Sequence, residues 1–361
     1  MNRYIRLSAA LALLMLALIP TFAVSAQDGI ETVCLVTDIG RVNDGTFNQY
    51  AYEGMMRAVE DFDLDSTFIE TQSQTDYQTN IETCLQEGYE VIITVGFLIA
   101  DATAEAAAAN PDVYFIGVDQ VNEDPENLPN YVGIQFREDQ AGFLVGAMAA
   151  LMTETNVIAG VYGIDVPAVV KFRHGFEQGA RYINPDIEVL GVYIASFTAP
   201  DLGAAAAEQF LGEGADVIFG AGGSTGSGGT LYAAQNGAYV IGVDQDEYFT
   251  TFGGGETPGA ENLITSAVKR VDNGVYNMIE LLVNGEPLPE DGIYMLEAAN
   301  DGIGFAPAHD ADVPEEVTER IQEIYEALKD GSLDTGVDPL TGALLEEAEA
   351  TEEATVEADE E

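Results

Sequence analysis

The peptide YFIGVDQ at residues 114–120 returns as YVIGVDQ at residues 239–245. A second pair is spaced almost identically, with GYEVIITVG at residues 88–96 and GADVIFGAG at residues 214–222. The two offsets, 125 and 126 residues, indicate that one βα unit has been used twice. The alternative is that any two buried parallel strands look alike, but the shared IGVDQ argues against it.

Short β-branched runs alternate with helix-like segments around both repeats. The expected strands cover residues 33–37, 66–70, 91–95 and 113–118, and then 157–162, 189–194, 217–221 and 239–243. The expected helices cover residues 47–62, 77–87, 100–109, 168–182, 202–213 and 229–236. Because the strand segments are apolar throughout and alternate with helices, they predict an α/β fold with parallel sheets buried on both faces.

The composition limits the classes of protein to which the chain can belong. Its 361 residues allow about two domains, and a hydrophobic share of 47% is enough for a sizeable core. Lys and Arg number 12 against 63 Asp and Glu, for a formal net charge of -51. Such a charge repels phosphate groups, so we expect neither nucleic acid nor an anionic membrane surface as a partner.

Both ends of the chain are predicted to lie outside the folded part. Residues 1–26 combine a positive start, an apolar run and a small-residue site at Ala26, which is typical of a secretory signal peptide; an uncleaved anchor is the alternative. No Cys follows that site, so a lipid anchor is not indicated. Residues 346–361 (EEAEATEEATVEADEE) predict a disordered acidic tail, or alternatively an acidic interaction tail. We therefore expect an exported protein, periplasmic or extracellular and associated with the cell surface.

The two cysteines, Cys34 and Cys84, lie in apolar strand and helix patterns. They could pair in an oxidising compartment, but sequence alone does not place their Cα atoms. Two buried thiols are the preferred interpretation, since free Cys is among the most buried residue types. With two Cys and two His, the chain cannot form a Cys-rich disulfide scaffold or a Cys/His zinc site.

Three aspartates, Asp38, Asp119 and Asp244, directly follow predicted strands. Ligands of open α/β sheets bind outside the carboxyl ends of the strands, and two such sheets can face each other across a cleft. Each aspartate alone could equally be a helix N-cap or a turn former. Their shared position favours a binding site that all three face.

Glycine-rich loops follow two of the strands. The loop at residues 38–49 lacks the G-x-G-x-x-G spacing, which excludes nicotinamide binding there. The segment GAGGSTGSGG at residues 220–229 misses that pattern by one residue and has no Lys for a P-loop. We expect its glycines, Gly222 among them, to let the backbone approach a neutral ligand closely; a flexible surface loop is the alternative.

Residues suited to catalysis are sparse. No nucleophile–base arrangement is visible, and His174 in a helical pattern is expected to be structural. A carboxylate pair of the glycosidase type stays open because acidic residues are abundant. The chain has three lysines, and Lys269, in TSAVKRV at residues 265–271, is expected to reach carboxylates around a hydroxyl-rich ligand. An ordinary surface lysine is the alternative.

Six segments resemble, in order and spacing, the basic membrane protein family, the purine-nucleoside-binding type of ABC-transporter substrate-binding lipoproteins. They are TDIGRVNDGTFNQYAYEGM (37–55), FIGVDQ (115–120), VKFRHGFEQGARYINPDI (170–187), GADVIFGAGGSTG (214–226), VIGVDQDEY (240–248) and TSAVKRVDNGVY (265–276). Together they span roughly residues 31–330. Most members of the family begin with a lipid-attached Cys, which this chain lacks.

The resemblance implies a type I periplasmic binding-protein fold, with two Rossmann-like lobes joined by three crossings near residues 137, 262 and 297. The implied lobes contain residues 31–137 with 263–297, and residues 138–262 with 298–335. It further implies a nucleoside whose base stacks between aromatic rings and whose ribose is held by carboxylates and a lysine. The implied binding residues are Asp38, Phe47, Asn48, Asp119, Asp244 and Lys269, with Gly222 beside them and Phe197 or, second, Phe172 as the opposing aromatic.

The implied partners are a small-molecule nucleoside and an ABC permease in the membrane. We expect a monomer that needs no cofactor and has no enzymatic activity. A sugar or autoinducer binding protein of the same fold is the first alternative, and a secreted nucleosidase or glycosidase is the second. If the protein binds nucleosides, Phe47→Ala should cost purine binding far more than pentose binding, which would argue against the first alternative. Release of free base on incubation with nucleosides would favour the second.

Overall fold

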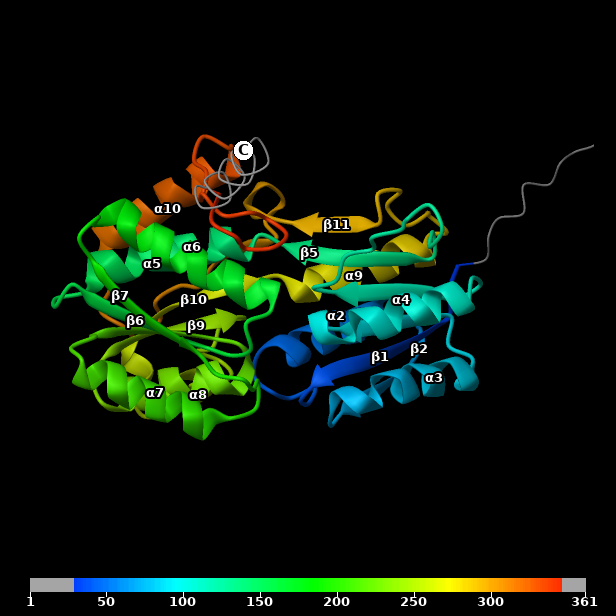
Figure 1. The fold of residues 1–361 in the computed structure, drawn as a ribbon, viewed down its shortest axis with the longest axis horizontal. Coiled ribbons are helices and arrows are strands. Elements are labelled where there is room, and N and C mark those ends of the chain that lie inside the picture. The colour runs from blue at the N-terminus through cyan, green and yellow to red at the C-terminus, as the bar shows by residue number, and fades with distance from the viewer. Residues whose placement is uncertain (1–28, 346–361) are drawn as a thin grey trace, which may run out of the picture.

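A computed structural model describes residues 29–345. The predicted signal peptide at residues 1–26 and the predicted acidic tail at residues 346–361 lie outside the described residues. The described chain forms two lobes, each built on a six-stranded sheet with helices on both faces (Figure 1). Over the described stretch, no helix combines the length and the apolar character needed to cross a membrane.

In the first lobe, every pair of neighbouring strands is parallel, in the order β11-β5-β4-β3-β1-β2. Its strands are β1 (Thr32–Ile39), β2 (Asp65–Thr71), β3 (Val91–Val95), β4 (Tyr114–Val118), β5 (Tyr131–Phe136) and β11 (Ile293–Leu296). Its helices are α2 (Phe47–Phe62), α3 (Tyr77–Glu87), α4 (Ala100–Ala109) and α9 (Val271–Val283), with 3-10 turns η1 (Gln74–Asp76) and η2 (Phe97–Ile99). One apolar core joins α2 and α9 to the sheet and another joins α3 and α4, which is why these strands are apolar throughout.

The second lobe repeats this plan in the order β12-β10-β9-β8-β6-β7, with β12 antiparallel to β10. Its strands are β6 (Val157–Tyr162), β7 (Glu188–Tyr193), β8 (Val217–Ala221), β9 (Tyr239–Asp244), β10 (Leu263–Lys269) and β12 (Ile303–Phe305). Its helices are α5 (Glu138–Met152), α6 (Pro167–Ile183), α7 (Pro200–Gly212), α8 (Gly223–Gln235) and α10 (Glu315–Lys329), with 3-10 turns η3 (Gly253–Gly255), η4 (Ala260–Asn262) and η5 (Ala298–Asn300). The main core packs α5, α6 and α10 on one face, and α7 and α8 cover the other.

The repeated peptides occupy equivalent places in the two sheets. The segments at residues 91–95 and 217–221 form β3 and β8, which hold the same position in their strand orders. The second GVD peptide ends β9, and the first lies across the end of β4, with Asp119 directly after the strand; β4 and β9 are again equivalent. The internal duplication expected from the sequence is therefore visible as two sheets with matching topology.

The chain passes between the lobes at three places: from β5 to α5, from β10 to α9, and from β11 to β12. The second passage differs from the one expected near residue 262. Strand β10 pairs with β9 and β12, so residues 263–269 belong to the second sheet and the chain leaves it after Lys269. This shift matters because it places Lys269 at the junction of the lobes.

Helix α8 begins at Gly223, earlier than the expected start at residue 229. Glycines disfavour helices, which is why the segment resembled a loop. In the fold they allow close packing: a Cβ on Gly226 would lie 2.6 Å from the backbone nitrogen of Ala221, and one on Gly228 would collide with the backbone of Pro200. The flexible-loop alternative is therefore wrong, because tertiary contacts with β8 and α7 override the low helix propensity.

Cys34 in β1 and Cys84 in α3 form a disulfide, with a Cα–Cα distance of 6.0 Å. Both residues are fully buried, as expected, but the interpretation as two free thiols is wrong. Helix α3 packs over β1 in the same apolar core, which brings the two side chains together. The disulfide joins residues separated by 50 positions and fixes α3 to the strand that carries Asp38.

Candidate functional site

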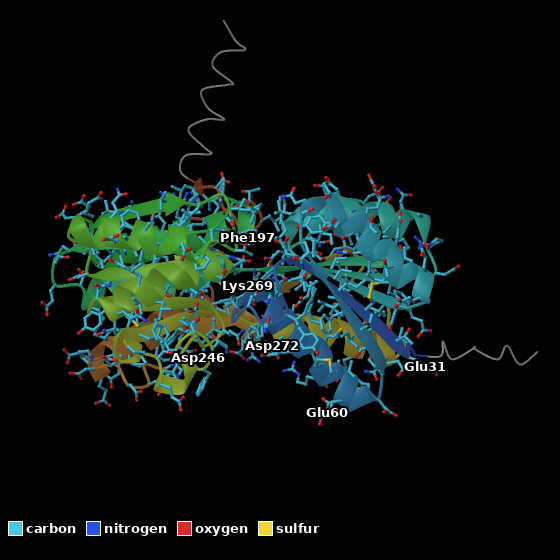
Figure 2. All side chains as sticks on the ribbon, turned by 90° about the horizontal axis from the view of Figure 1, so that it is seen from below. Glu31, Glu60, Phe197, Asp246, Lys269 and Asp272 are labelled. Carbon is cyan, nitrogen blue, oxygen red and sulfur yellow. A yellow bond between two sulfur atoms is a disulfide. The ribbon has the colours of Figure 1, made fainter. Side chains whose placement is uncertain are left out.

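A cavity lies between the lobes, where the carboxyl ends of their strands meet, and residues of both lobes line it. Figure 2 places Lys269 and Phe197 in the region where the lobes meet. The structure brings all of the sequence-predicted site residues to this cavity: Asp38, Phe47, Asn48, Asp119, Phe172, Phe197, Gly222, Asp244 and Lys269.

Asp38 lies near the carboxyl end of β1 and is buried. The Tyr77 hydroxyl donates a hydrogen bond to its carboxylate, and the backbone N–H of Ile39 donates another at 2.7 Å. Burial raises the pKa of Asp38 to about 6, although the hydrogen bond from Tyr77 opposes this rise. The carboxyl group is thus held in place by α3 and borders the cavity.

Asp44 organises the turn that presents Phe47. Its carboxylate accepts hydrogen bonds from the backbone N–H of Thr46 (2.9 Å) and from the side-chain Nδ2 of Asn48 (3.0 Å). Asn48 Oδ1 in turn accepts the backbone N–H of Asp38 (3.0 Å), so the start of α2 is tied to the end of β1. Burial raises the pKa of Asp44, and the hydrogen bond from Thr46 opposes the rise.

Asp119 and Asp244 follow or end equivalent strands, and both adopt a left-handed backbone, with φ of 60° and 66°. Such a conformation is uncommon outside glycine, although Asp tolerates it better than most residues, and it is typical of strained functional positions. Both side chains border the cavity. For Asp119, burial raises the pKa, and the ammonium group of Lys269 opposes this effect.

Lys269 is the last residue of β10, and its side chain is 1% exposed. Its Nζ lies 2.7 Å from Asp119 Oδ2 and 2.7 Å from Glu138 Oε1. It also lies 4.9 Å from the centroid of the Phe47 ring, within cation–π range. Burial alone would lower the pKa of Lys269, but Asp119 and Glu138 hold it above the ordinary value, so the ammonium group stays charged.

Aromatic rings border the cavity from both lobes. Phe47 begins α2 in the first lobe, and Phe197 follows β7 in the second; both are half-buried. Phe172 also reaches the cavity, but it is 3% exposed and packs against Phe219 in the core, with ring centroids 6.1 Å apart. Phe47 and Phe197 are therefore better placed than Phe172 to contact a ligand on its two sides.

Sequence reasoning missed three residues at or beside the cavity. Asp44 precedes Phe47 by three positions, and its place before a predicted helix was a usable capping signal. Phe97 borders the cavity and is 43% exposed; its place directly after a predicted strand was the available signal. Glu138 contacts Lys269 but lies in a largely apolar segment with no motif, so nothing in the sequence pointed to it.

The lobes also touch directly beside the cavity. The side-chain Nε2 of Gln245, the residue after Asp244, donates a hydrogen bond to the backbone oxygen of Thr46 at 3.1 Å. Thr46 precedes Phe47, so this contact joins the turn that carries the first-lobe ring to the strand end that carries Asp244. The structure thus has its lobes in mutual contact around the site.

The electrostatics of the cavity suit a neutral ligand with many hydroxyl groups. Four carboxyl groups border it, those of Asp38, Asp44, Asp119 and Asp244, and Lys269 supplies an ammonium group. Carboxylates accept hydrogen bonds from hydroxyl groups, and the ammonium group donates hydrogen bonds to hydroxyl oxygens; both kinds are charge-assisted. Within residues 29–345, no group of His, Cys, Asp and Glu side chains is arranged to hold a metal ion.

Two solved structures share the two-lobed architecture. A solute-binding protein of an ABC transporter system from Aeropyrum pernix has a TM-score of 0.74 at 23% identity, covering 84% of this chain and 92% of that one. Another from Conexibacter woesei has a TM-score of 0.65 at 21% identity, covering 86% and 99%. These likenesses confirm the expected type I solute-binding fold.

Comparison with related sequences identifies the family, which the fold alone does not. Residues 31–331 match the family model Bmp, described as ABC transporter substrate-binding protein PnrA-like. The ABC transporter nucleoside-binding protein BmpA of Lactococcus lactis is 31% identical, covering 74% of this chain and 79% of that protein. Basic membrane protein B of Borreliella burgdorferi is 30% identical, covering 77% and 83%.

Substrate-binding proteins of ABC importers act outside the cytoplasm, where they bind a small molecule and interact with a membrane permease. The CD4+ T-cell-stimulating antigen of Listeria monocytogenes is a further relative, 29% identical over 84% of this chain and 87% of that protein. The family match covers nearly all of the described residues. The chain therefore belongs to the Bmp family of ABC transporter substrate-binding proteins.

Proposed function

We propose that this protein binds a nucleoside, with a purine base preferred, between its lobes and presents it to the permease of its importer. The observation that carries the proposal is the position of Phe47 and Phe197 on opposite lobes of a cavity that also contains Lys269. A nucleoside has a flat apolar base and a hydroxylated ribose, and this cavity offers partners for both. The nucleoside-binding name of the Lactococcus lactis relative adds support.

The base is proposed to lie between Phe47 and Phe197. Stacking of a base on an aromatic side chain contributes about 1–3 kcal/mol per base. A purine presents a larger face than a pyrimidine, so the two rings favour purines. Because the rings belong to different lobes, full stacking requires both lobes to close on the same ligand.

The ribose is proposed to lie against Lys269, Asp119 and Asp244. Lys269 is charged and already oriented by Asp119 at 2.7 Å, so it can donate to a hydroxyl oxygen without further ordering. Hydrogen bonds that involve a charged group contribute about 1.5–3 kcal/mol each. The side chains around Lys269 are acidic, so a phosphate on the ligand would be repelled, and we expect nucleosides to bind more tightly than nucleotides.

The transport role is proposed to depend on lobe closure. A ligand that contacts both lobes stabilises the closed arrangement, and the permease then distinguishes closed from open protein. The hydrogen bond between Gln245 and Thr46 supports this view, because it joins the lobes beside the cavity. We expect the exported chain to act as a monomer.

The proposal is tested by titrating protein freed of ligand by unfolding and refolding with its disulfide intact. Binding is measured by calorimetry with inosine, adenosine, uridine, adenine, D-ribose and inosine monophosphate. We expect purine nucleosides to bind most tightly. Tighter binding of the monophosphate than of inosine would contradict the proposed electrostatics, and equal binding of D-ribose and inosine would favour the sugar alternative. Chromatography of the recovered ligand should show intact nucleoside; free base would instead indicate a nucleosidase.

A further inference from the structure

Glu138 is a fully buried carboxylate at the junction of the lobes. It is the first residue of α5, the helix with which the chain enters the second lobe after β5. Its Oε1 lies 2.7 Å from Nζ of Lys269, and its Oε2 lies 2.6 Å from Nζ of Lys171. One carboxylate therefore bridges two ammonium groups, with one oxygen for each.

Lys171 is as deeply buried as Glu138 but does not border the ligand cavity. It lies on α6, and its Nζ donates to the backbone oxygens of Phe136 (2.8 Å) and Pro339 (3.2 Å). These carbonyls belong to the end of β5 and to the segment after α10. Lys171 is therefore an internal anchor, and Glu138 connects it to Lys269.

These contacts form a chain of alternating charges that crosses from one lobe to the other. The order is Asp119, Lys269, Glu138 and Lys171, with each neighbouring pair at 2.7 Å or less. The charges balance, two negative against two positive. A buried ion pair is tolerated only when its partners are close and satisfied, so removal of one member leaves an uncompensated charge.

Glu138 restricts where the Lys269 ammonium group can lie. A lysine side chain has four rotatable bonds, and ordering it costs conformational entropy. Asp119 approaches Nζ from the first lobe and Glu138 approaches it from the second, while the Phe136 ring lies 4.7 Å away. With Glu138 removed, the ammonium group could turn toward Asp244, whose carboxyl group already attracts it electrostatically.

We propose that Glu138 is a positioning residue for ligand binding, which holds the Lys269 ammonium group at the cavity through the ion chain anchored at Lys171. The proposal rests on the proposed function, because it assigns Lys269 a role toward the ligand. Glu138 itself does not line the cavity and acts through Lys269. Two ammonium groups lower the pKa of Glu138 against the opposing effect of burial, which keeps the bridge ionised.

The test uses Glu138→Gln, Lys171→Met and the double variant, with Glu177→Gln as the matched control. Glu177 also bridges two cations, Arg173 at 2.9 Å and Arg181 at 3.3 Å, but on the outer part of α6. Inosine is the probe, and thermal unfolding is measured beside affinity. We expect E138Q to weaken inosine binding by about tenfold or more, and E177Q to change it by less than about twofold.

The double variant separates positioning from stability. It removes the charges of Glu138 and Lys171 together, so Lys171 no longer leaves an unpaired ammonium group in the core. Lys269 also loses Glu138 but keeps its ion pair with Asp119. We expect E138Q/K171M to regain thermal stability relative to E138Q but to keep its weak inosine binding. If the double variant instead recovers the affinity, the loss in E138Q came from the unpaired Lys171, and the proposal is overturned.

A readout without ligand distinguishes this inference from the proposed function. The chain has three lysines, so selective 15N labelling gives three side-chain signals. Lys329, whose ammonium group pairs with the exposed Asp301, is assigned through Lys329→Arg. We expect E138Q to shift the Lys269 signal and to speed exchange of its ammonium protons. An unchanged Lys269 signal would overturn the proposal even if inosine binds, whereas a shifted signal without inosine binding would contradict only the proposed function.

Discussion

Asp119 and Asp244 hold the same position in the two lobes, but Lys269 makes them chemically different. Asp119 accepts a hydrogen bond from Lys269 at 2.7 Å, whereas Asp244 forms no ion pair within residues 29–345. Burial raises the pKa of Asp244 to about 7, while Lys269 opposes the rise and Asp119 adds to it. The two equivalent carboxyl groups thus differ in their contact with the one cation that lies between them.

Replacement of Asp244 by Asn should stabilise the ligand-free protein above pH 7 and change little near pH 4. The unfolded carboxyl loses its proton near the ordinary value of 3.8, but the folded one keeps it up to about pH 7. Between these values the folded state binds more protons, so the free energy of unfolding falls as the pH rises. The Asn variant escapes this loss, which we expect to be about 4 kcal/mol above pH 7, since one pKa unit corresponds to about 1.4 kcal/mol.

Urea unfolding of wild type and D244N at pH 4.5 and pH 8 measures this difference. The exposed Asp186 provides the control for the change from Asp to Asn, through D186N. A D244N effect of equal size at both pH values would show that the carboxyl is not held protonated by burial. The same variant should bind inosine more weakly at pH 8, where an ionised Asp244 would accept a ribose hydroxyl.

Truncation of Phe47 to Ala should cost more for a nucleoside than for a free sugar. Phe47 borders the cavity and its ring lies 4.9 Å from Lys269 Nζ, so the substitution removes the stacking face in the first lobe. We expect inosine affinity to fall by about tenfold or more, and D-ribose affinity to change by less than about threefold. Phe249, which is 65% exposed and outside the cavity, provides the control through F249A. Equal losses for inosine and D-ribose would remove the case for stacking.

Much of the fold was predictable because the strands are buried on both faces. Segments such as residues 91–95 and 217–221 are apolar without interruption, and their ends coincide with strands β3 and β8. Helix α5, in contrast, was not predicted. Its sequence EDQAGFLVGAMAALM is apolar around nearly its whole circumference, because it is buried between α6, α10 and the sheet, so no helical period is visible.

The site was predictable where a residue type and a strand end coincide. Asp38, Asp119 and Asp244 were found in this way. Lys269 was found because lysines are scarce, and Gly222 because it lies in a glycine-rich segment after a strand. The family resemblance added Asn48 and the aromatic residues. Glu138 could not be found, because its importance comes from contacts with Lys171 and Lys269, which are distant in sequence. The pairing of the two cysteines was equally hidden, since it depends on how α3 lies across β1.

Reduction of the Cys34–Cys84 disulfide should lower the free energy of unfolding by about 4 kcal/mol, since the bond closes a loop of 50 residues. The effect is measured by urea unfolding with and without dithiothreitol. The variant C34A/C84A provides the control, because it should be insensitive to the reductant. If wild type unfolds identically under both conditions, the two side chains are thiols in solution.

Reduction should also weaken ligand binding, through Tyr77. Helix α3 carries both Cys84 and Tyr77, whose hydroxyl donates a hydrogen bond to Asp38. A loosened α3 would release Asp38 from this contact. We expect Tyr77→Phe to weaken inosine binding by about threefold to tenfold. Dithiothreitol should then weaken inosine binding little further, because the contact that reduction would loosen is already absent in this variant. Unchanged binding in Y77F would show that Asp38 needs no support from α3.

Loss of the contact between Gln245 and Thr46 should speed ligand release. The Gln245 side chain donates across the lobes at 3.1 Å, and it is 8% exposed, so water replaces it poorly. Gln245→Leu removes this hydrogen bond to the backbone oxygen of Thr46. The free energy that favours the closed arrangement should therefore fall by about 0.5–1.5 kcal/mol. We expect inosine to dissociate about two to ten times faster, measured by stopped-flow fluorescence of the tyrosines. Gln235→Leu, at the exposed end of α8, controls for the change of side chain. Equal dissociation rates in the two variants would mean that the hydrogen bond between Gln245 and Thr46 does not hold the lobes together.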